Sequence, residues 1–309
     1  MNLSFFSKKN VVYIILGSTL CALSMGYLNL AYEWKEVFVA LAEISYPILI
    51  VKICGIHCCY LFLRTWRLFF LVRRINYKIS FSELYIITAI VVGLAMLTPG
   101  QIGELLKIEL LKRRALLDRL PGLGSFAVER FTDLLAITVF GCLGFLGLDG
   151  DHRDFIVPLG GGLGLIILSA LLIIPFFFRE KALPAWCLHI RSGCGTLWIW
   201  LRVFALTMFS WGCVYWTWIL ILNTVQVHIH FWDIAWLLFV VTIGTILSFM
   251  PGGFGMADVI TVELLIGLGA ESMAAQTGAV LLRLYGLMIA GFGLIHFFAY
   301  SIYIYIKKI

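Results

Sequence analysis

The chain has 309 residues, of which 62% are hydrophobic and only 13% are charged, and its mean hydropathy is +1.01. A water-soluble core cannot bury this much apolar surface, so the composition excludes a soluble globular protein and predicts an integral membrane protein. No polar segment is long enough to fold separately, so we expect a single membrane domain over residues 1–309. The net charge of +6 is modest, and its distribution along the chain is more informative than its sum.

The chain begins with two long apolar segments. Residues 11–31 form the first expected span and residues 38–63 the second. Basic residues precede the first span, which places the N-terminus in the cytoplasm by the positive-inside rule. After the second span comes a basic cluster that we expect on the same face, made of Arg64, Arg67, Arg73, Arg74 and Lys78.

The next apolar segment, residues 84–97, has only about 14 residues and is too short to cross a membrane. It ends at Pro99-Gly100, and a second basic cluster follows at Lys107, Lys112, Arg113, Arg114 and Arg119. A full crossing would place this second cluster outside, whereas a turn at Pro99 keeps both clusters inside. We therefore expect a re-entrant helical hairpin.

Three more crossings lead to a second short segment. Residues 122–148 cross outward, residues 155–178 return, and residues 197–223 cross outward again. From residue 234, about 16 apolar residues reach Pro251, which predicts a second hairpin that enters from outside. Residues 273–306 complete an all-α fold of about six spans and two re-entrant hairpins, with both termini in the cytoplasm.

The two short segments occupy corresponding places in two halves of the chain. Residues 38–148 and 197–306 each follow the order span, hairpin, span, in opposite directions through the membrane. Inverted repeats of this kind are typical of transporters, and paired interrupted segments point to a substrate site near the membrane midplane.

Both breaks carry the same motif. Residues 96–104 read Met-Leu-Thr-Pro-Gly-Gln-Ile-Gly-Glu, and residues 249–258 read Phe-Met-Pro-Gly-Gly-Phe-Gly-Met-Ala-Asp. We expect hairpin tips at Pro99 and Pro251, each followed by a helix whose positive dipole end suits an anionic group. Small residues there allow close approach of a headgroup or of another helix. The candidate binding residues at the tips are Gly100, Gln101, Gly103, Gly252, Gly253 and Gly255.

An arginine follows each motif inside an apolar helix. Arg130 lies about eight residues, or about 12 Å, into its span, and Arg283 about ten residues into the last span. A mid-span arginine costs about 2.5–3.5 kcal/mol, so each should face the interior and be paired. Each either braces a carboxylate of its own hairpin or receives a phosphate of the substrate. The candidate partners are Glu104 and Asp133 for Arg130, and Asp258 and Glu263 for Arg283.

Acids outnumber these arginines in both halves. The first half has Glu104, Glu129 and Asp133 for Arg130, so it is not an obvious anion site. One explanation is that Glu129 faces lipid headgroups. Another is that burial protonates one carboxylate in each half, and that its titration couples transport to a proton gradient.

Together these motifs resemble the lysylphosphatidylglycerol synthase transmembrane region family of flippase-like proteins. The resemblance runs from about Arg64 to the C-terminus. It is carried by Arg64 and Arg67 with Tyr77, by Pro99-Gly-Gln-Ile-Gly-Glu104, by Glu129-Arg-Phe-Thr-Asp133, and by Pro251-Gly-Gly-Phe-Gly255 with Arg283. The family's second hairpin usually ends in a glutamate preceded by a basic residue, where this chain has Ala257 and Asp258. The resemblance implies movement of a lipid with a polar or charged headgroup between leaflets.

We expect a non-enzymatic flippase of the cytoplasmic membrane that moves an anionic lipid, either a phospholipid or a polyprenyl-phosphate-linked lipid. The soluble transfer domain of the fused relatives has no room here, so we expect no synthase activity. One alternative is a membrane partner of a lipid-modifying glycosyltransferase or synthase without transport of its own. Another is an intramembrane enzyme that acts on a lipid phosphate with Glu104 or Asp133 as acid or base. No P-loop, Rossmann or metal-binding motif is present, so we expect no cofactor, no metal and no nucleic-acid partner.

Overall fold

The computed structural model describes residues 26–73, 79–115, 118–147, 197–227, 229–248 and 250–308, together with Thr19 and Leu23. Every regular element in these ranges is a helix, which confirms the all-α prediction. The predicted span at residues 155–178 and most of the predicted span at residues 11–31 lie outside the described residues.

Four helices in the described part are long and apolar enough to cross a membrane, which supports a multi-pass membrane protein. They are α3 (Tyr46–Arg73), α6 (Arg119–Gly147), α9 (Leu197–Thr224) and α12 (Ser272–Lys308). The last three agree closely with the predicted spans at residues 122–148, 197–223 and 273–306.

The predicted span at residues 38–63 is wrong at both ends. A separate short helix, α2 (Trp34–Ala42), precedes a break, and α3 begins at Tyr46 and continues to Arg73. Pro47 explains the late start, because proline is favoured in the first turn of a helix and cannot continue a helix that precedes it. The extension past residue 63 places Arg64 and Arg67 inside a helix rather than in a loop.

The two shorter apolar helices are α4 (Phe81–Leu97) and α10 (Phe231–Leu247), and each has 17 residues. After α4, a turn leads into the 3-10 helix η2 (Ile102–Leu105) and then α5 (Leu106–Ala115). After α10, a turn leads into α11 (Met256–Gly267). Both helices therefore end just before the proline-glycine motifs, as the sequence predicts.

The two turns meet inside the molecule. A short antiparallel bridge pairs Pro99 with Pro251. The backbone at Gly100 and Gly252 is left-handed, with φ of 54° and 56°, and this conformation favours glycine. The next residue is also left-handed in both turns, although it is Gln101 in one and Gly253 in the other.

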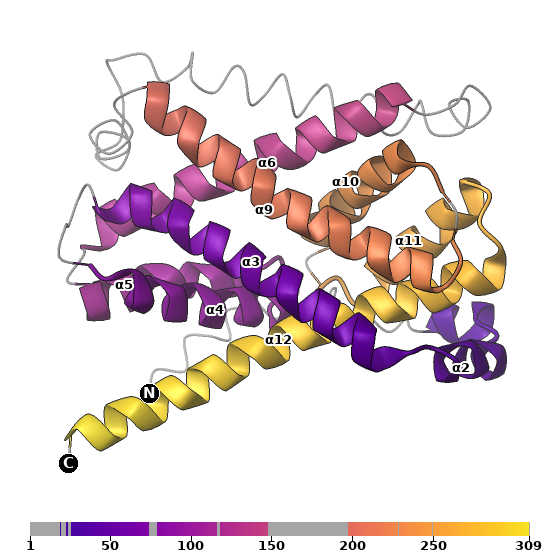
Figure 1. The fold of residues 1–309 in the computed structure, drawn as a ribbon, viewed down its shortest axis with the longest axis horizontal. Helices are drawn as coiled ribbons and strands as arrows, with labels where there is room; N and C mark the ends of the chain where they lie inside the picture. Colours follow the sequence, from indigo (N-terminus) through magenta and orange to yellow (C-terminus); the bar gives the residue numbers. More distant parts are fainter. Residues whose placement is uncertain are drawn as a thin grey trace.

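The helices with the most extensive contacts form three pairs, α3 with α9, α4 with α12, and α6 with α10 (Figure 1). Two glycines let α4 and α12 pack backbone to backbone, because a Cβ added to Gly93 would lie 2.5 Å from the Cα of Gly293. This close packing fixes the first turn, which follows α4, against the helix that carries Arg283.

Candidate functional site

A cavity of about 200 Å³ lies where the two turns meet. Its wall contains residues of six long helices as well as residues of both turns. The ionisable and polar side chains on this wall include Tyr60, Arg64, Gln101, Glu104, Arg130, Asp133, Asp258 and Arg283. All five charged residues predicted as site residues therefore line one cavity.

On the first side of the cavity, two arginines share two carboxylates. Arg130 Nη2 lies 2.7 Å from Glu104 and 2.6 Å from Asp133, so both predicted partners contact it. Arg64 Nη2, from α3, lies 3.3 Å from Glu104 and 3.5 Å from Asp133. Arg64 Nη1 also donates to the hydroxyl of Tyr60 at 2.8 Å. These contacts hold η2, α3 and α6 together around the cavity.

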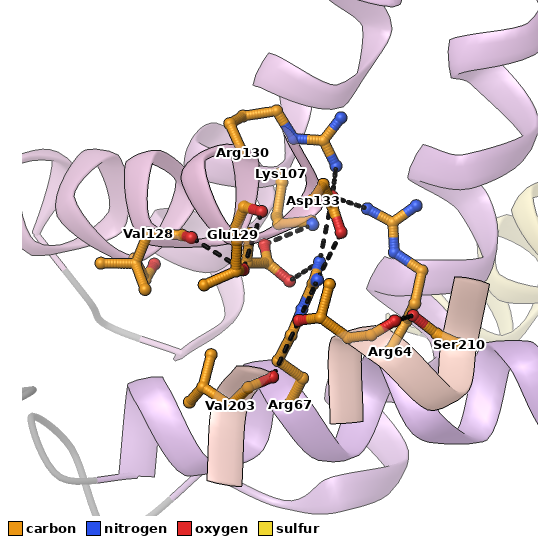
Figure 2. A network of polar contacts seen from close by, with 12 residues as sticks. Arg64, Arg67, Lys107, Val128, Glu129, Arg130, Asp133, Val203 and Ser210 are labelled. Atoms are coloured by element: carbon orange, nitrogen blue, oxygen red, sulfur yellow. Dashed lines mark hydrogen bonds and ion pairs between the residues drawn. The ribbon is translucent and has the colours of Figure 1, made fainter. Parts of the chain in front are cut away.

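Behind this pair lies a second, fully enclosed group of charges (Figure 2). Glu129 accepts from Lys107 Nζ at 2.7 Å and from Arg67 Nη2 at 3.2 Å. Arg67 also donates to Asp133 and, at 2.9 Å, to Thr207 of α9. The side chains of Arg67, Lys107 and Glu129 are at most 1% exposed, and none of the three lines the cavity. They support the cavity wall from behind.

This arrangement corrects two expectations from the sequence, one about three basic residues and one about Glu129. Arg64, Arg67 and Lys107 belong to basic clusters that the sequence places at the cytoplasmic face, but their side chains are buried and paired rather than exposed. Glu129 was a candidate for contact with lipid headgroups, but it is enclosed between two cations. The physical reason is charge balance, because three buried carboxylates are tolerated only with cations beside them.

On the second side of the cavity, Arg283 braces its own turn. Its Nε and Nη2 donate to Asp258 at 3.0 and 2.8 Å, and its Nη1 donates to the carbonyl of Gly252 at 2.7 Å. Its guanidinium also lies over the ring of Phe254, 4.4 Å from the centroid. Of the two predicted partners, Asp258 is therefore right. Glu263 is wrong, because it accepts from Tyr27 instead.

Several backbone N–H groups at the tips already have acceptors. Ile102 N donates to the carbonyl of Pro99 at 3.1 Å, and Gly103 N donates to Thr98 Oγ1 at 2.8 Å. In the second turn, Gly255 N donates to the carboxylate of Asp258 at 3.0 Å. The dipoles of the following helices still favour an anion, but these N–H groups are not free to donate to a ligand.

The predicted glycines mainly shape the turns. A Cβ on Gly103 would lie 2.7 Å from Thr98 Oγ1, and one on Gly252 would lie 2.5 Å from the carbonyl oxygen of Met96. Gln101 and Gly252 line the cavity, whereas Gly100, Gly103, Gly253 and Gly255 are not part of its wall.

A family model described as the lysylphosphatidylglycerol synthase TM region matches residues 14–293. The chain belongs to this family. The match includes both turns and every charged residue of the cavity, so it confirms the resemblance seen in the sequence. No curated protein sequence matches the chain significantly.

In this member of the lysylphosphatidylglycerol synthase TM region family, the cations of the buried network that were not predicted as site residues are Arg64, Arg67 and Lys107. A signal for the first two was present. Arg64 and Arg67 are three residues apart, which places them on one helical face, and they follow an apolar run without a turn residue. The excess of acids over Arg130 also required further cations somewhere in the interior.

Proposed function

We propose that the protein is a lipid flippase of the cytoplasmic membrane that moves a phospholipid or a polyprenyl-phosphate-linked lipid between leaflets. The observation that carries this proposal is a single charged cavity whose wall combines both turns, with Arg130 on one side and Arg283 on the other. Charged groups inside an apolar membrane protein mark a substrate pathway by default. An arginine is well suited to bind a phosphate headgroup.

We also propose that α4 with α5 and α10 with α11 are re-entrant hairpins of an inverted repeat, within about six spans. At 1.5 Å per residue, a 17-residue helix is about 25 Å long, which is less than the hydrocarbon core of about 30 Å. In the proposed repeat, α4 of the first half corresponds to α10 of the second, and α6 corresponds to α12. The α4–α12 pair therefore corresponds to the α10–α6 pair, and the helices of both pairs pack extensively. The C-terminal ends of α3 and α12 lie toward the same end of the molecule (Figure 1), which supports a cytoplasmic C-terminus beside the basic loops.

The cavity favours transport over chemistry. Of the candidate acids or bases of an intramembrane enzyme, Glu104 contacts two arginines and Asp133 contacts three. Carboxylates held in this way are poor proton donors, because the neighbouring cations stabilise the ionised form. We therefore propose that the protein moves its lipid without a catalytic step.

Reconstitution into liposomes tests the proposal. Lipids with a fluorescent headgroup are added, and a membrane-impermeant quencher reports which of them reach the outer leaflet. We expect wild-type protein to expose the inner-leaflet pool and Arg130→Ala with Arg283→Ala to do so much more slowly. Lys112→Ala with Arg113→Ala is the matched control, because it removes two exposed cations that do not line the cavity.

Two outcomes would contradict the proposal at different levels. Normal flipping by the double arginine variant would remove these residues from the site. No flipping of any candidate lipid by wild-type protein, together with co-purification of a lipid-modifying enzyme, would favour a partner protein instead.

A further inference from the structure

The charges around the cavity do not cancel. Within the described residues, the network has five cations and four carboxylates, which leaves one positive charge without a counterion. The cations are Arg64, Arg67, Lys107, Arg130 and Arg283, and the carboxylates are Glu104, Glu129, Asp133 and Asp258.

The excess charge lies on the first side of the cavity. On the second side, Arg283 and Asp258 balance each other one to one. On the first side, Lys107 and Arg67 both contact Glu129 behind the cavity wall, and Arg67 also contacts Asp133. What remains is a pair of arginines, Arg64 and Arg130, on the cavity wall, with Glu104 shared between them.

These two arginines also keep unused donors. The Nε atoms of Arg64 and Arg130 are buried and have no hydrogen-bond partner. Arg130 contacts both of its carboxylates through Nη2 alone, and its side chain is 28% exposed. Arg64 is 6% exposed, so its free donor is held inside the protein, where an unpaired polar group is costly. Figure 2 shows the two guanidinium groups on either side of Asp133.

We infer that the cavity selects a headgroup with a single negative charge, a phosphodiester bound on the cavity side of Arg64 and Arg130, and rejects a diphosphate. One negative charge completes the balance of the network, and phosphate oxygens accept from the exposed part of the Arg130 guanidinium on the cavity wall. A second negative charge on the ligand would be buried without a counterion, which is strongly unfavourable.

This inference rests on the proposed function and divides its two substrate classes. Ordinary phospholipids and sugars joined to a polyprenyl chain through one phosphate carry a single phosphodiester charge, and both are accepted. Carriers that bear a diphosphate are not accepted. Arg283 then acts as a positioning residue that shapes the second turn and contributes its charge at a distance.

Two ligands that differ only in the headgroup give a direct test. Geranylgeranyl methyl phosphate carries one charge, and geranylgeranyl diphosphate carries more than one on the same tail. Native mass spectrometry of the full-length protein in detergent, with both ligands in equal amounts, measures the preference. We expect wild-type protein to bind the phosphodiester at least about tenfold more tightly, as expected for one uncompensated charge in a partly buried site.

A charge series tests the cause of the preference. Asp258→Asn removes a carboxylate, which makes the net charge of the network more positive by one. It should shift the preference toward the diphosphate by about tenfold. Arg283→Gln removes a positive charge and should weaken binding of the phosphodiester by a similar factor. The double variant restores the original charge, so it should restore the original preference although it lacks the brace between α11 and α12. A purely structural role of Arg283 would leave the double variant as impaired as the single one.

Equal binding of both ligands by wild-type protein, or a preference for the diphosphate, would overturn the inference without any variant. If liposome flipping persisted in that case, the proposed function would stand and only the selectivity would fail. Selective binding of the phosphodiester without flipping would leave the selectivity standing and overturn the proposed function.

Discussion

Glu129→Gln is the substitution whose cost is easiest to work out from the structure. It removes the carboxylate that Lys107 contacts at 2.7 Å and Arg67 at 3.2 Å, and both cations are at most 1% exposed. The two cations would then be buried with one fewer counterion. Removal of one partner from a buried ion pair typically costs about 3–5 kcal/mol, and we expect a loss of that size in the free energy of unfolding.

The double substitution Lys107→Met with Glu129→Gln tests whether this loss of stability comes from a buried cation without its counterion. It removes one charge of each sign, and methionine fills much of the space of the lysine stem. We expect it to be more stable than Glu129→Gln alone by at least about 2 kcal/mol, a clear departure from additivity. Unfolding is measured at equilibrium in mixed micelles, by titration with a denaturing detergent.

Glu109→Gln is the matched control for the same assay. Glu109 also contacts two cations, Arg113 and Arg119, at 2.9 and 3.0 Å, but the two arginines are 73% and 65% exposed. Because surface ion pairs contribute little, we expect almost no change in stability. Similar losses in the free energy of unfolding from Glu109→Gln and Glu129→Gln would refute the claim that burial of the network sets the cost of losing a carboxylate. So would a double variant, Lys107→Met with Glu129→Gln, whose loss equals the sum of the two single losses.

Three further predictions follow from the turns and the helix contacts. Gly93→Val should lower the free energy of unfolding by about 1–3 kcal/mol, because its Cβ would lie 2.5 Å from the Cα of Gly293. Gly291→Val is the control and should not lower it, because a Cβ at position 291 would meet no atom within 4 Å. Gln101→Gly should raise the free energy of unfolding by up to about 1 kcal/mol, because Gln101 has a left-handed φ of 58°, which glycine adopts without strain. In a chain without native cysteines, Gln101→Cys should react with a water-soluble maleimide from the cytoplasm and Phe254→Cys from outside. Labelling of position 101 only from outside would contradict the proposed hairpins.

Much of the fold could be predicted because its signals are local. Proline and glycine end α4 and α10 just before each turn, and apolar runs fix α6, α9 and α12 to within a few residues. The start of α3 was missed because residues 38–63 were predicted as a single span, although Glu43 and Ser45 interrupt the apolar run. Pro47 was the local signal for that break, but it is a weaker signal than the proline-glycine pairs.

Four of the nine residues in the charged network were not predicted as site residues, because their pairing depends on contacts between distant parts of the chain. Arg67 and Glu129 are 62 positions apart, and Arg64 and Asp133 are 69 apart. Positive charge at the end of an apolar run usually marks a cytoplasmic loop, so this rule gave no indication that Arg64 and Arg67 are buried within a helix. Only the surplus of acids in α6 and η2 pointed to missing cations in the interior.

The two turns have closely similar backbones and different electrostatics, and this difference bears on where a ligand binds. In the second turn, all three guanidinium nitrogens of Arg283 donate to Asp258 or to turn carbonyls. In the first turn, Thr98 satisfies the backbone, which relieves Arg130 of that role and leaves part of its guanidinium facing the cavity. A repeated backbone motif therefore does not imply a repeated binding site. The arginine that braces its turn and the arginine that faces the cavity follow their turns at similar distances along the chain, and the acceptors around each one decide which role it takes.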